Sequence, residues 1–464
     1  MSNFLIYTLW NTIQKIISAW RTALEFHLIG RSIVTDSYHY AMRVIAIFRR
    51  LFVDGTFEAT FITHLFKQKD QPSFIRSVFY KMFKLCLLVI GLLIISSPII
   101  AYLSVTDWTR GKLIIIFIIF FSPLIGLMFS MSFFTALLNA NKRLDISSFS
   151  PIIGNIAFCA FLYLLCKAGF ITIGIIVGNL IYAALQVLVM WYYCREYVGD
   201  HIIDLPVDFI EDTTKNSIWT ILIPFTDVII DRIALKIAVG SLSCLSYAHK
   251  IEQFIFSILA IPLSAMTISD FSKLASTHNE DVEFSPYSKK VTEIFILSHI
   301  LILPITIFLY VNSNQLIHFF LDYFFKKSDL LLSTIISIMS LSLYCFIQNR
   351  ILSNILITSR HINLNLLCTI TNSVVSIIFA LFAKTTVDLA WASNFAIFSQ
   401  VLISFFISIY YKYIRFDLSH TLYFICSIIA SFIIVKLPMI SFIGLYPIYL
   451  LIFYDYTHIL LQKK

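Results

Sequence analysis

The chain is dominated by long apolar runs, and these constrain its fold more than any other feature. A run of about 20 apolar residues can cross the hydrocarbon core of a membrane as an α-helix. Because the runs do not alternate polar and apolar residues, they exclude an outer-membrane barrel. Hydrophobic residues make up 59% of the 464 and charged residues 13%, which excludes a soluble enzyme, a single-span receptor and a disordered chain. The runs predict twelve transmembrane helices, at roughly 82–104, 112–138, 148–167, 170–193, 217–239, 242–269, 292–311, 331–357, 362–383, 387–411, 419–436 and 438–457.

Two further helices are predicted before these, at roughly 4–29 and 37–66, and they are unusually polar. Their apolar residues recur at helical spacing, which predicts one face toward lipid or protein and one face toward water. A hydropathy window alone would reject them as spans. With them, the chain is predicted to be an all-α, polytopic membrane protein of about 14 transmembrane helices. Their ionisable residues include Lys15, Arg21, Glu25, His27, Asp36, Arg43, Arg49, Arg50, Asp54 and Glu58.

The charges of the predicted loops indicate the orientation of the chain. Loops on one side of the membrane carry about twice as many Lys and Arg residues as loops on the other side. This bias predicts an even number of spans, with both termini cytoplasmic. The net charge of +8 is explained by these loops, so no nucleic-acid partner is predicted.

A short pattern recurs at corresponding points of the two halves of the chain. The first copy contains Arg21, Ala23, Leu24, Gly30, Ser37, Tyr38 and Arg43, and the second contains Arg232, Ala234, Leu235, Gly240, Ser246, Tyr247 and Lys250. Two repeats of this kind are a known transporter plan, with the substrate bound between the halves. We therefore predict an N-terminal lobe at 1–193, a cytoplasmic linker at 194–216, a second six-helix lobe at 217–411 and two additional helices at 412–464.

Ionisable side chains inside the spans are the best guide to function. Each one costs about 2.5–3.5 kcal/mol at the bilayer centre, so it persists only beside water, a partner or a ligand. In the first two helices, the cations outnumber what local carboxylates can neutralise. One interpretation is internal salt bridges, as between Arg21 and Glu25 at i,i+4. The interpretation that we favour is a basic, water-filled cavity that binds a phosphate, carboxylate or diphosphate.

The second half of the chain adds further charges but no catalytic motif. Asp231 lies toward the outer end of its predicted helix, where a solvated pair with Arg232 is an alternative, whereas Lys250 and Glu252 lie one to two turns inside theirs. The histidines are scattered, so no metal site is predicted. The chain has no nucleotide-binding loop, hydrolase elbow or zinc-protease motif. We therefore predict no enzyme activity and no cofactor.

Two segments resemble a known family. The segment from Arg21 to Phe61 resembles the N-terminal signature of the MurJ/MviN-type lipid II flippases, in the multidrug/oligosaccharidyl-lipid/polysaccharide exporter superfamily. The segment that begins at Gly240 resembles the family's Gly-Ser-Val-Ser-x-Leu-x-Tyr-Ala-Asp-Arg block. The residues that match the first signature are Arg21, Gly30, Thr35, Asp36, Arg49, Arg50, Phe52, Asp54, Gly55 and Phe57.

The sequence also departs from the family pattern. Lys15 stands where the family usually has Arg, and His249-Lys250 replaces Asp-Arg. Lys250 keeps the positive charge but lacks the planar fork that binds a phosphate bidentately. The second helix has no Pro before its arginine pair, and Asp270 occupies the place of a common Pro. The chain is therefore predicted to be a divergent member, or a relative that moves another lipid-linked glycan.

The resemblance implies a flippase that moves an undecaprenyl-diphosphate-linked peptidoglycan precursor across the bacterial inner membrane by alternating access. Its partners would be this lipid-linked glycan and membrane lipids. It would act as a monomer and without a cofactor, and the resemblance does not identify the coupling ion. Lys15, Arg21, Arg49 and Lys250 would bind the diphosphate in a central cavity. The alternatives are a flippase for another polyprenyl-linked oligosaccharide such as O-antigen units, a cation-coupled drug exporter, and a membrane-embedded transferase. The residues expected to gate the path or balance its charge are Asp36, Arg50, Asp54, Asp231 and Glu252.

Overall fold

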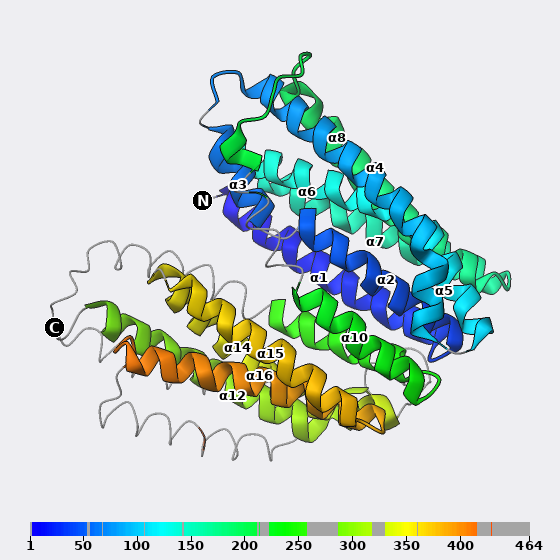
Figure 1. Ribbon diagram of the computed structural model, residues 1–464, viewed down its shortest axis with the longest axis vertical. Helices are drawn as coiled ribbons and strands as arrows, with labels where there is room; N and C mark the ends of the chain where they lie inside the picture. The colour runs from blue at the N-terminus through cyan, green and yellow to red at the C-terminus, as the bar shows by residue number, and fades with distance from the viewer. Residues whose placement is uncertain are drawn as a thin grey trace. The chain divides into compact units, whose positions relative to one another are not determined.

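The computed structural model describes residues 2–52, 56–66, 68–105, 107–141, 143–210, 213, 222–257, 286–317, 330–359, 361–414 and 428. All regular structure in these ranges is helical, which confirms the predicted all-α class (Figure 1). The chain divides into two compact units, Met1–Ser246 and Tyr247–Lys464, and each is described by itself. The lobe boundaries predicted from the sequence stay a prediction.

The first unit is a helical bundle in which α7 packs along α8, α1 packs on α7, and α2 packs on both α5 and α10. A further helix begins at residue 241 and is described as far as residue 257. The elements of the first unit are α1 (Ser2–Ile29), α2 (Ile33–Phe52), α3 (Thr56–Leu65), α4 (Gln71–Ser104), α5 (Trp108–Phe121), α6 (Leu124–Ala140), α7 (Leu144–Lys167), α8 (Ile171–Cys194), the 3₁₀ turn η1 (Arg195–Tyr197) and α10 (Leu222–Ile237).

A cluster of phenylalanine rings joins α3 to α4 and α6. Phe57 packs edge-on against Phe129, and Phe61 packs against both Phe74 and Phe133. All five side chains are buried. Aromatic pairs add about 0.5–1.5 kcal/mol each to the stability that their burial provides, so this cluster fixes the position of α3 in the bundle.

The hydrophilic connection after α8 is attached to the first turns of α4. Arg76 donates a hydrogen bond to the backbone carbonyl of Gly199 at 3.0 Å, and the backbone N–H of Ile203 donates to the Ser77 hydroxyl at 2.7 Å. The helix itself begins at Asp70, whose carboxylate accepts a hydrogen bond from the Ser73 backbone N–H. The hydrogen bonds from Ser73 lower the pKa of the Asp70 carboxyl, so it stays ionised as the N-cap. Part of the predicted linker therefore packs along the first turns of α4 and is hydrogen-bonded to them.

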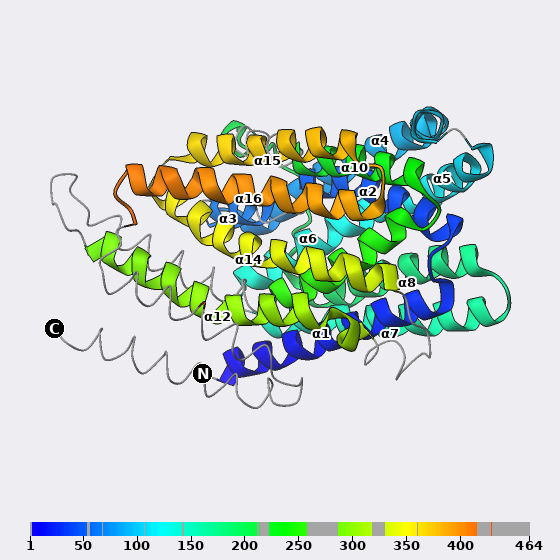
Figure 2. The same cartoon turned by 90° about the horizontal axis from the view of Figure 1, so that it is seen from below.

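The second unit contains residues 247–257 of the helix that begins at 241, with α12 (Pro286–Ile317), α14 (Leu330–Thr358), α15 (Ile362–Phe382) and α16 (Thr386–Tyr410). The helix α14 packs against both α12 and α16, and α15 packs on α16 (Figure 2). Ile255 and Phe256 pack against a buried cluster that includes Leu309 of α12 and Leu343 of α14. These contacts hold residues 247–257 against α12 and α14.

The spans predicted from the sequence agree in part with the described helices. Seven described helices are long and apolar enough to cross a membrane, or eight if α5 and α6 form one span bent by 40°. As expected, α1 and α2 are absent from this set. The span predicted at 112–138 consists of two helices, α5 and α6, which meet at Pro123 with a bend of 40° and together are long and apolar enough for one span. Likewise, α4 begins at Gln71 rather than near 82, and 37–66 contains two helices, α2 and α3. The predicted helices at 419–436 and 438–457 lie almost wholly outside the described residues.

Candidate functional site

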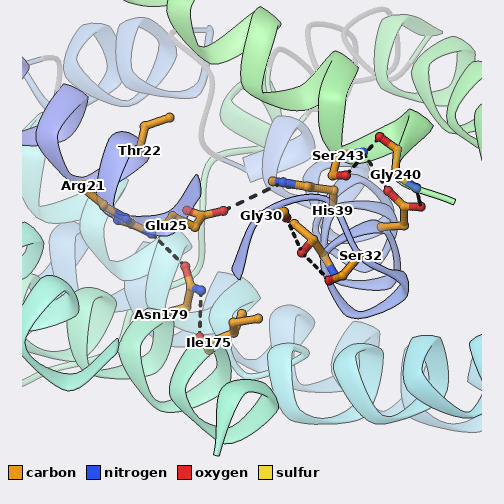
Figure 3. Close-up of polar contacts among 12 residues, drawn as sticks. Arg21, Thr22, Glu25, Gly30, Ser32, His39, Ile175, Asn179, Gly240 and Ser243 are labelled. Atoms are coloured by element: carbon orange, nitrogen blue, oxygen red, sulfur yellow. Dashed lines mark hydrogen bonds and ion pairs between the residues drawn. The ribbon is translucent and has the colours of Figure 1, made fainter. Parts of the chain in front are cut away.

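Arg21, on α1, is held by side chains from two other helices. Its Nη1 donates a hydrogen bond to Asn155 Oδ1 at 3.1 Å. Its Nη2 donates a hydrogen bond to Asn179 Oδ1 at 2.9 Å (Figure 3). Its guanidinium carbon lies 3.6 Å from the centroid of the Phe158 ring and 4.6 Å from that of the Tyr182 ring. These amides and rings are uncharged, and they orient the guanidinium. Buried Glu25, one turn further along α1, lies with Arg21 within electrostatic reach of Tyr38 and Cys159. The geometry therefore presents a fixed cation among transmembrane helices.

Two glycines explain how these asparagines come together. A Cβ added to Gly154 of α7 would lie 2.8 Å from the backbone carbonyl oxygen of Tyr182 in α8. A Cβ added to Gly178 of α8 would lie 3.0 Å from the Phe158 ring of α7. Small residues of this kind let helix backbones approach closely in membranes. Because each glycine directly precedes one of the two asparagines, the close packing of α7 and α8 also forms the acceptor pair for Arg21.

Other ionisable residues of α1 lie on either side of Arg21. Glu25 is buried, with 1% of its surface exposed, and its Oε1 lies 3.8 Å from His39 Nε2 on α2 (Figure 3). Lys15, predicted to assist in binding the diphosphate, is partly buried. Its predicted role and that of Arg21 stay predictions.

Asp36 binds backbone amides. Its two carboxylate oxygens accept hydrogen bonds from the backbone N–H groups of Gly240 at 2.6 Å and Ser243 at 2.8 Å. These amides lie at the N-terminus of the helix that begins at residue 241, where a carboxylate is favoured by the unpaired N–H groups and the helix dipole. We predicted that Asp36 balances the nearby cations, and that role stays a prediction. In the structure, the buried Asp36 carboxylate caps the helix that begins at residue 241. It thereby connects the first turn of α2 to the turn that follows α10.

The glycine turns of the predicted repeat share one backbone conformation. Gly30 has a φ of 64° and Gly240 a φ of 84°, in the left-handed region that favours glycine. In both turns a side-chain hydroxyl donates back to the glycine carbonyl, from Thr35 at 2.9 Å and from Ser243 at 3.2 Å. A Cβ on Gly240 would also lie 2.9 Å from the Cβ of Arg31. The repeat noticed in the sequence therefore corresponds to a repeated helix–glycine–helix turn.

Arg43, on α2, forms an ion cluster with α10. Its Nε lies 3.0 Å from Asp231 Oδ2, and its Nη1 lies 3.5 Å from Asp227 Oδ2. The two aspartates are one helical turn apart, so they face the same side of α10. Asp231 was predicted to gate the path or balance charge, and the structure gives it Arg43 as a partner. The gating role stays a prediction.

Three of the predicted site residues cannot be placed. The backbone of Arg49 and Arg50 belongs to α2, but their side chains lie outside the described part of the structure, and Asp54 lies outside the described residues altogether. Their predicted roles stay predictions.

Lys250 and Glu252 belong to the second unit. The Nζ atom of Lys250 lies 5.3 Å from the centroid of the Tyr247 ring. Glu252 is buried and contacts Ser342 of α14 and His249 of its own helix. Within the described ranges, no group of three His, Cys, Asp or Glu residues could hold a metal ion.

Sequence reasoning missed Asn155 and Asn179, the partners of Arg21. A signal for them was present, because Gly-Asn occurs at 154–155 and again at 178–179, in two consecutive apolar runs. An amide inside a membrane helix needs a partner, and a glycine beside it indicates where a neighbouring helix comes close. Read together, the two pairs predict that α7 and α8 pack closely and hold two neighbouring amides that need a polar partner.

The comparisons with known proteins agree with this architecture. The family model described as lipid II flippase MurJ matches residues 26–460. A probable lipid II flippase MurJ of Treponema pallidum (strain Nichols) is 19% identical over 339 residues, covering 68% of this chain and 62% of that protein. A probable lipid II flippase MurJ of Buchnera aphidicola subsp. Acyrthosiphon pisum is 24% identical over 383 residues, covering 75% and 71% of the two chains.

Solved structures show the same fold. A structure of lipid II flippase MurJ in an inward closed conformation matches with a TM-score of 0.80 at 17% identity, covering 97% of this chain and 99% of that one. An inward-facing multidrug resistance MATE family transporter of the MOP superfamily matches with a TM-score of 0.57 at 11% identity, covering 88% and 95%. The two matches show a fold that this chain shares with both proteins. Since the family model covers nearly the whole chain, this protein belongs to the lipid II flippase MurJ family.

Proposed function

We propose that this chain is a lipid II flippase, which moves an undecaprenyl-diphosphate-linked peptidoglycan precursor from the inner to the outer leaflet of a bacterial inner membrane. Within the family already established, the observation that carries the proposal is Arg21. A guanidinium held by amides and aromatic rings keeps its positive charge and some of its five N–H donors for a ligand. A diphosphate is a ligand of complementary charge and geometry, and it cannot cross hydrocarbon unaided.

In this proposal, Lys15, Arg21, Arg49 and Lys250 bind the diphosphate and the lipid tail stays on the lipid side. Alternating access between two lobes carries the headgroup across the membrane. The protein acts as a monomer with both termini cytoplasmic. It transports the lipid without altering it, so it is not an enzyme.

The test is complementation of a bacterial strain depleted of its own lipid II flippase. The intact chain should restore growth, and Arg21→Ala should abolish the rescue at an equal level of protein in the membrane. The matched control is Arg195→Ala, because Arg195 also lies against an aromatic ring, that of Tyr192 at 4.5 Å, but is exposed beyond the end of α8. This control should restore growth as the intact chain does.

Rescue by Arg21→Ala would contradict the proposed binding role. A failure of the intact chain to complement, together with accumulation of another lipid-linked sugar when its gene is deleted, would instead favour a different polyprenyl-linked oligosaccharide. Chemical turnover of lipid II by the purified protein in detergent would contradict a transporter without enzyme activity.

A further inference from the structure

A cavity of about 500 Å³ lies where α4 ends, α5 begins and α10 approaches its last turn. The proposed diphosphate path does not use it. Its charged and aromatic lining comes from Tyr102 of α4, Asp107 and Trp108 at the start of α5, and Arg232 and Lys236 of α10. A volume of this size is typical of ligand sites, so the chemistry of the lining indicates what the cavity can bind.

The charge of the lining is positive. Arg232 and Lys236 are one helical turn apart, so they share a face of α10 and repel each other. The acid of the lining, Asp107, is already engaged as the N-cap of α5. Its carboxylate accepts a hydrogen bond from the Thr109 backbone N–H at 2.9 Å and lies 4.0 Å from Arg110 Nε. An anion between Arg232 and Lys236 would relieve their repulsion.

The helices around the cavity are fixed by contacts that leave these two cations in place. Arg110 Nη1 donates a hydrogen bond to the backbone carbonyl of Leu235 at 2.7 Å, which holds α5 against the last turn of α10. Both acids of α10, Asp227 and Asp231, contact Arg43 of α2. The carboxylates closest in sequence to Arg232 therefore bond to another helix.

The apolar surroundings indicate that the anion belongs to a lipid. Tyr102 and Trp108 are both exposed, and these residue types gather where headgroups meet hydrocarbon. A stripe of exposed apolar side chains, three or four residues apart, runs along α4 to the cavity and consists of Leu92, Ile95, Ile99 and Tyr102. From Leu92 to Tyr102 the helix rises about 15 Å, which is half of a hydrocarbon core of about 30 Å. The α4 stripe thus offers a surface as long as one leaflet is deep.

We propose that this cavity binds the phosphate group of an anionic phospholipid, with an acyl chain along the α4 stripe. Arg232 and Lys236 hold the phosphate, which accepts charge-assisted hydrogen bonds from both residue types. Under the proposed orientation of the chain, with both termini cytoplasmic, the lipid comes from the outer leaflet. The site does not rest on the proposed flippase function.

Photolabelling of the intact protein in phosphatidylcholine vesicles tests the site. The probe is phosphatidylglycerol with a photoreactive diazirine on one acyl chain, and the reference is phosphatidylcholine with the same group at the same density. Labelled peptides are identified by mass spectrometry. Phosphatidylglycerol should label the α4 stripe several-fold more than phosphatidylcholine does. Equal labelling by the two lipids would overturn the proposal.

Lys236→Gln removes one of the two cations. A basic residue near a membrane surface contributes about a fivefold preference for anionic lipid, so the ratio of anionic to zwitterionic labelling should fall about fivefold. The matched control is Lys167→Gln, because Lys167 is also exposed and lies in the last turn of its helix, α7. It should keep the ratio of the intact protein. Adding Arg232→Gln to Lys236→Gln should lower the ratio further, and an unchanged ratio in this double variant would contradict the site.

Thermal unfolding in detergent separates a lost site from a defect in folding. Without added lipid, Lys236→Gln should unfold at the temperature of the intact protein. Phosphatidylglycerol should raise the unfolding temperature of the intact protein and of Lys167→Gln by several degrees, because it binds the folded state, and it should have less effect on Lys236→Gln. The same rise in all three proteins would contradict a role of Lys236.

Two competitors identify the source of the phosphate. Inorganic phosphate and lipid II are each added to the photolabelling reaction in the concentration range of the probe. Labelling of the α4 stripe should persist with both. Displacement by inorganic phosphate would overturn the lipid as occupant in favour of a free anion, and displacement by lipid II would assign the site to the transported lipid instead.

Discussion

Arg21 on α1 and Arg43 on α2 are both held by other helices of the first unit, but their partners differ in charge. Arg21 bonds to two neutral amides and lies against two aromatic rings. Arg43 contacts two carboxylates, Asp231 at 3.0 Å and Asp227 at 3.5 Å. The hydrogen-bond acceptors of Arg21 are neutral, with Glu25 one turn along the same helix, whereas the acceptors of Arg43 are themselves charged.

This difference separates a binding role from a structural one. A buried ion pair roughly balances its own desolvation penalty, and removing one partner leaves an unpaired charge behind. A cation whose hydrogen-bond partners are neutral takes that compensation from a more distant acid, here Glu25 one turn along α1, or from an anionic ligand. We therefore expect substitutions at the Arg21 site to affect transport more than stability, and substitutions at the Arg43 cluster to do the reverse.

The largest effect on transport should come from giving Arg21 a carboxylate partner in place of a neutral amide, as Arg43 has. Asn179→Asp places a carboxylate of nearly the same shape beside the guanidinium, so the diphosphate must displace an ion pair before it binds. A charge-assisted hydrogen bond is worth about 1.5–3 kcal/mol, so the initial rate of lipid II flipping should fall about 10–100-fold. The flipping assay in proteoliposomes measures this rate.

Asn394→Asp is the matched control for this change. Asn179 donates a hydrogen bond to the carbonyl of Ile175 at 2.8 Å, and Asn394 donates to that of Ile338 at 2.7 Å. Both substitutions lose an amide donor, but only the first adds a charge next to Arg21. Normal flipping by Asn179→Asp, with unchanged thermal stability, would contradict the binding role of Arg21.

The largest effect on stability is expected at Arg43. Arg43→Ala leaves two aspartates one turn apart on α10 without their cation, and Asp231 is 8% exposed. Removing one partner of a fully buried pair costs about 3–5 kcal/mol. Since Arg43 is 27% exposed, we expect a loss of about 2–3 kcal/mol. Thermal unfolding of the purified protein in detergent measures the change.

A second substitution should repair this defect. Adding Asp231→Asn to Arg43→Ala removes the more buried carboxylate, so most of the lost stability should return. If Arg43→Ala unfolds at the temperature of the intact chain but no longer flips lipid II, Arg43 belongs to the binding machinery and the comparison with Arg21 fails.

Much of the helical architecture was predictable, because membrane helices depend on local properties. The run lengths located α7, α8, α14, α15 and α16 to within a few residues. The bend at Pro123 could not be told from the sequence alone, because Pro98, Pro151 and Pro304 lie inside continuous helices. The start of α4 was misjudged because its first turns are polar: they are covered by the connection after α8, which a hydropathy pattern does not reveal.

The partners of the charged residues were less predictable, because they depend on contacts far apart in the sequence. Arg21 bonds to residues 134 and 158 positions away. Charge counting grouped Asp36 with the cations, but its described hydrogen bonds go to backbone amides of the Gly240 turn. Counting charges in the sequence can identify a polar interior. It cannot identify the partner of each charged side chain, because that depends on which helices are in contact.

The smallest effect on stability is expected at Asp227, the more exposed of the two carboxylates that contact Arg43. Its carboxylate lies 3.5 Å from Arg43 and is 30% exposed, so solvent already screens part of the attraction. Asp227→Asn should therefore reduce stability by only about 0.5 kcal/mol, and added salt should shrink this difference further. Asp231→Asn should cost more and respond less to salt, because Asp231 is 8% exposed and its carboxylate lies closer, at 3.0 Å. If the two variants lose equal stability in thermal unfolding, Arg43 interacts equally strongly with both carboxylates, and their difference in burial does not affect the strength of the interaction.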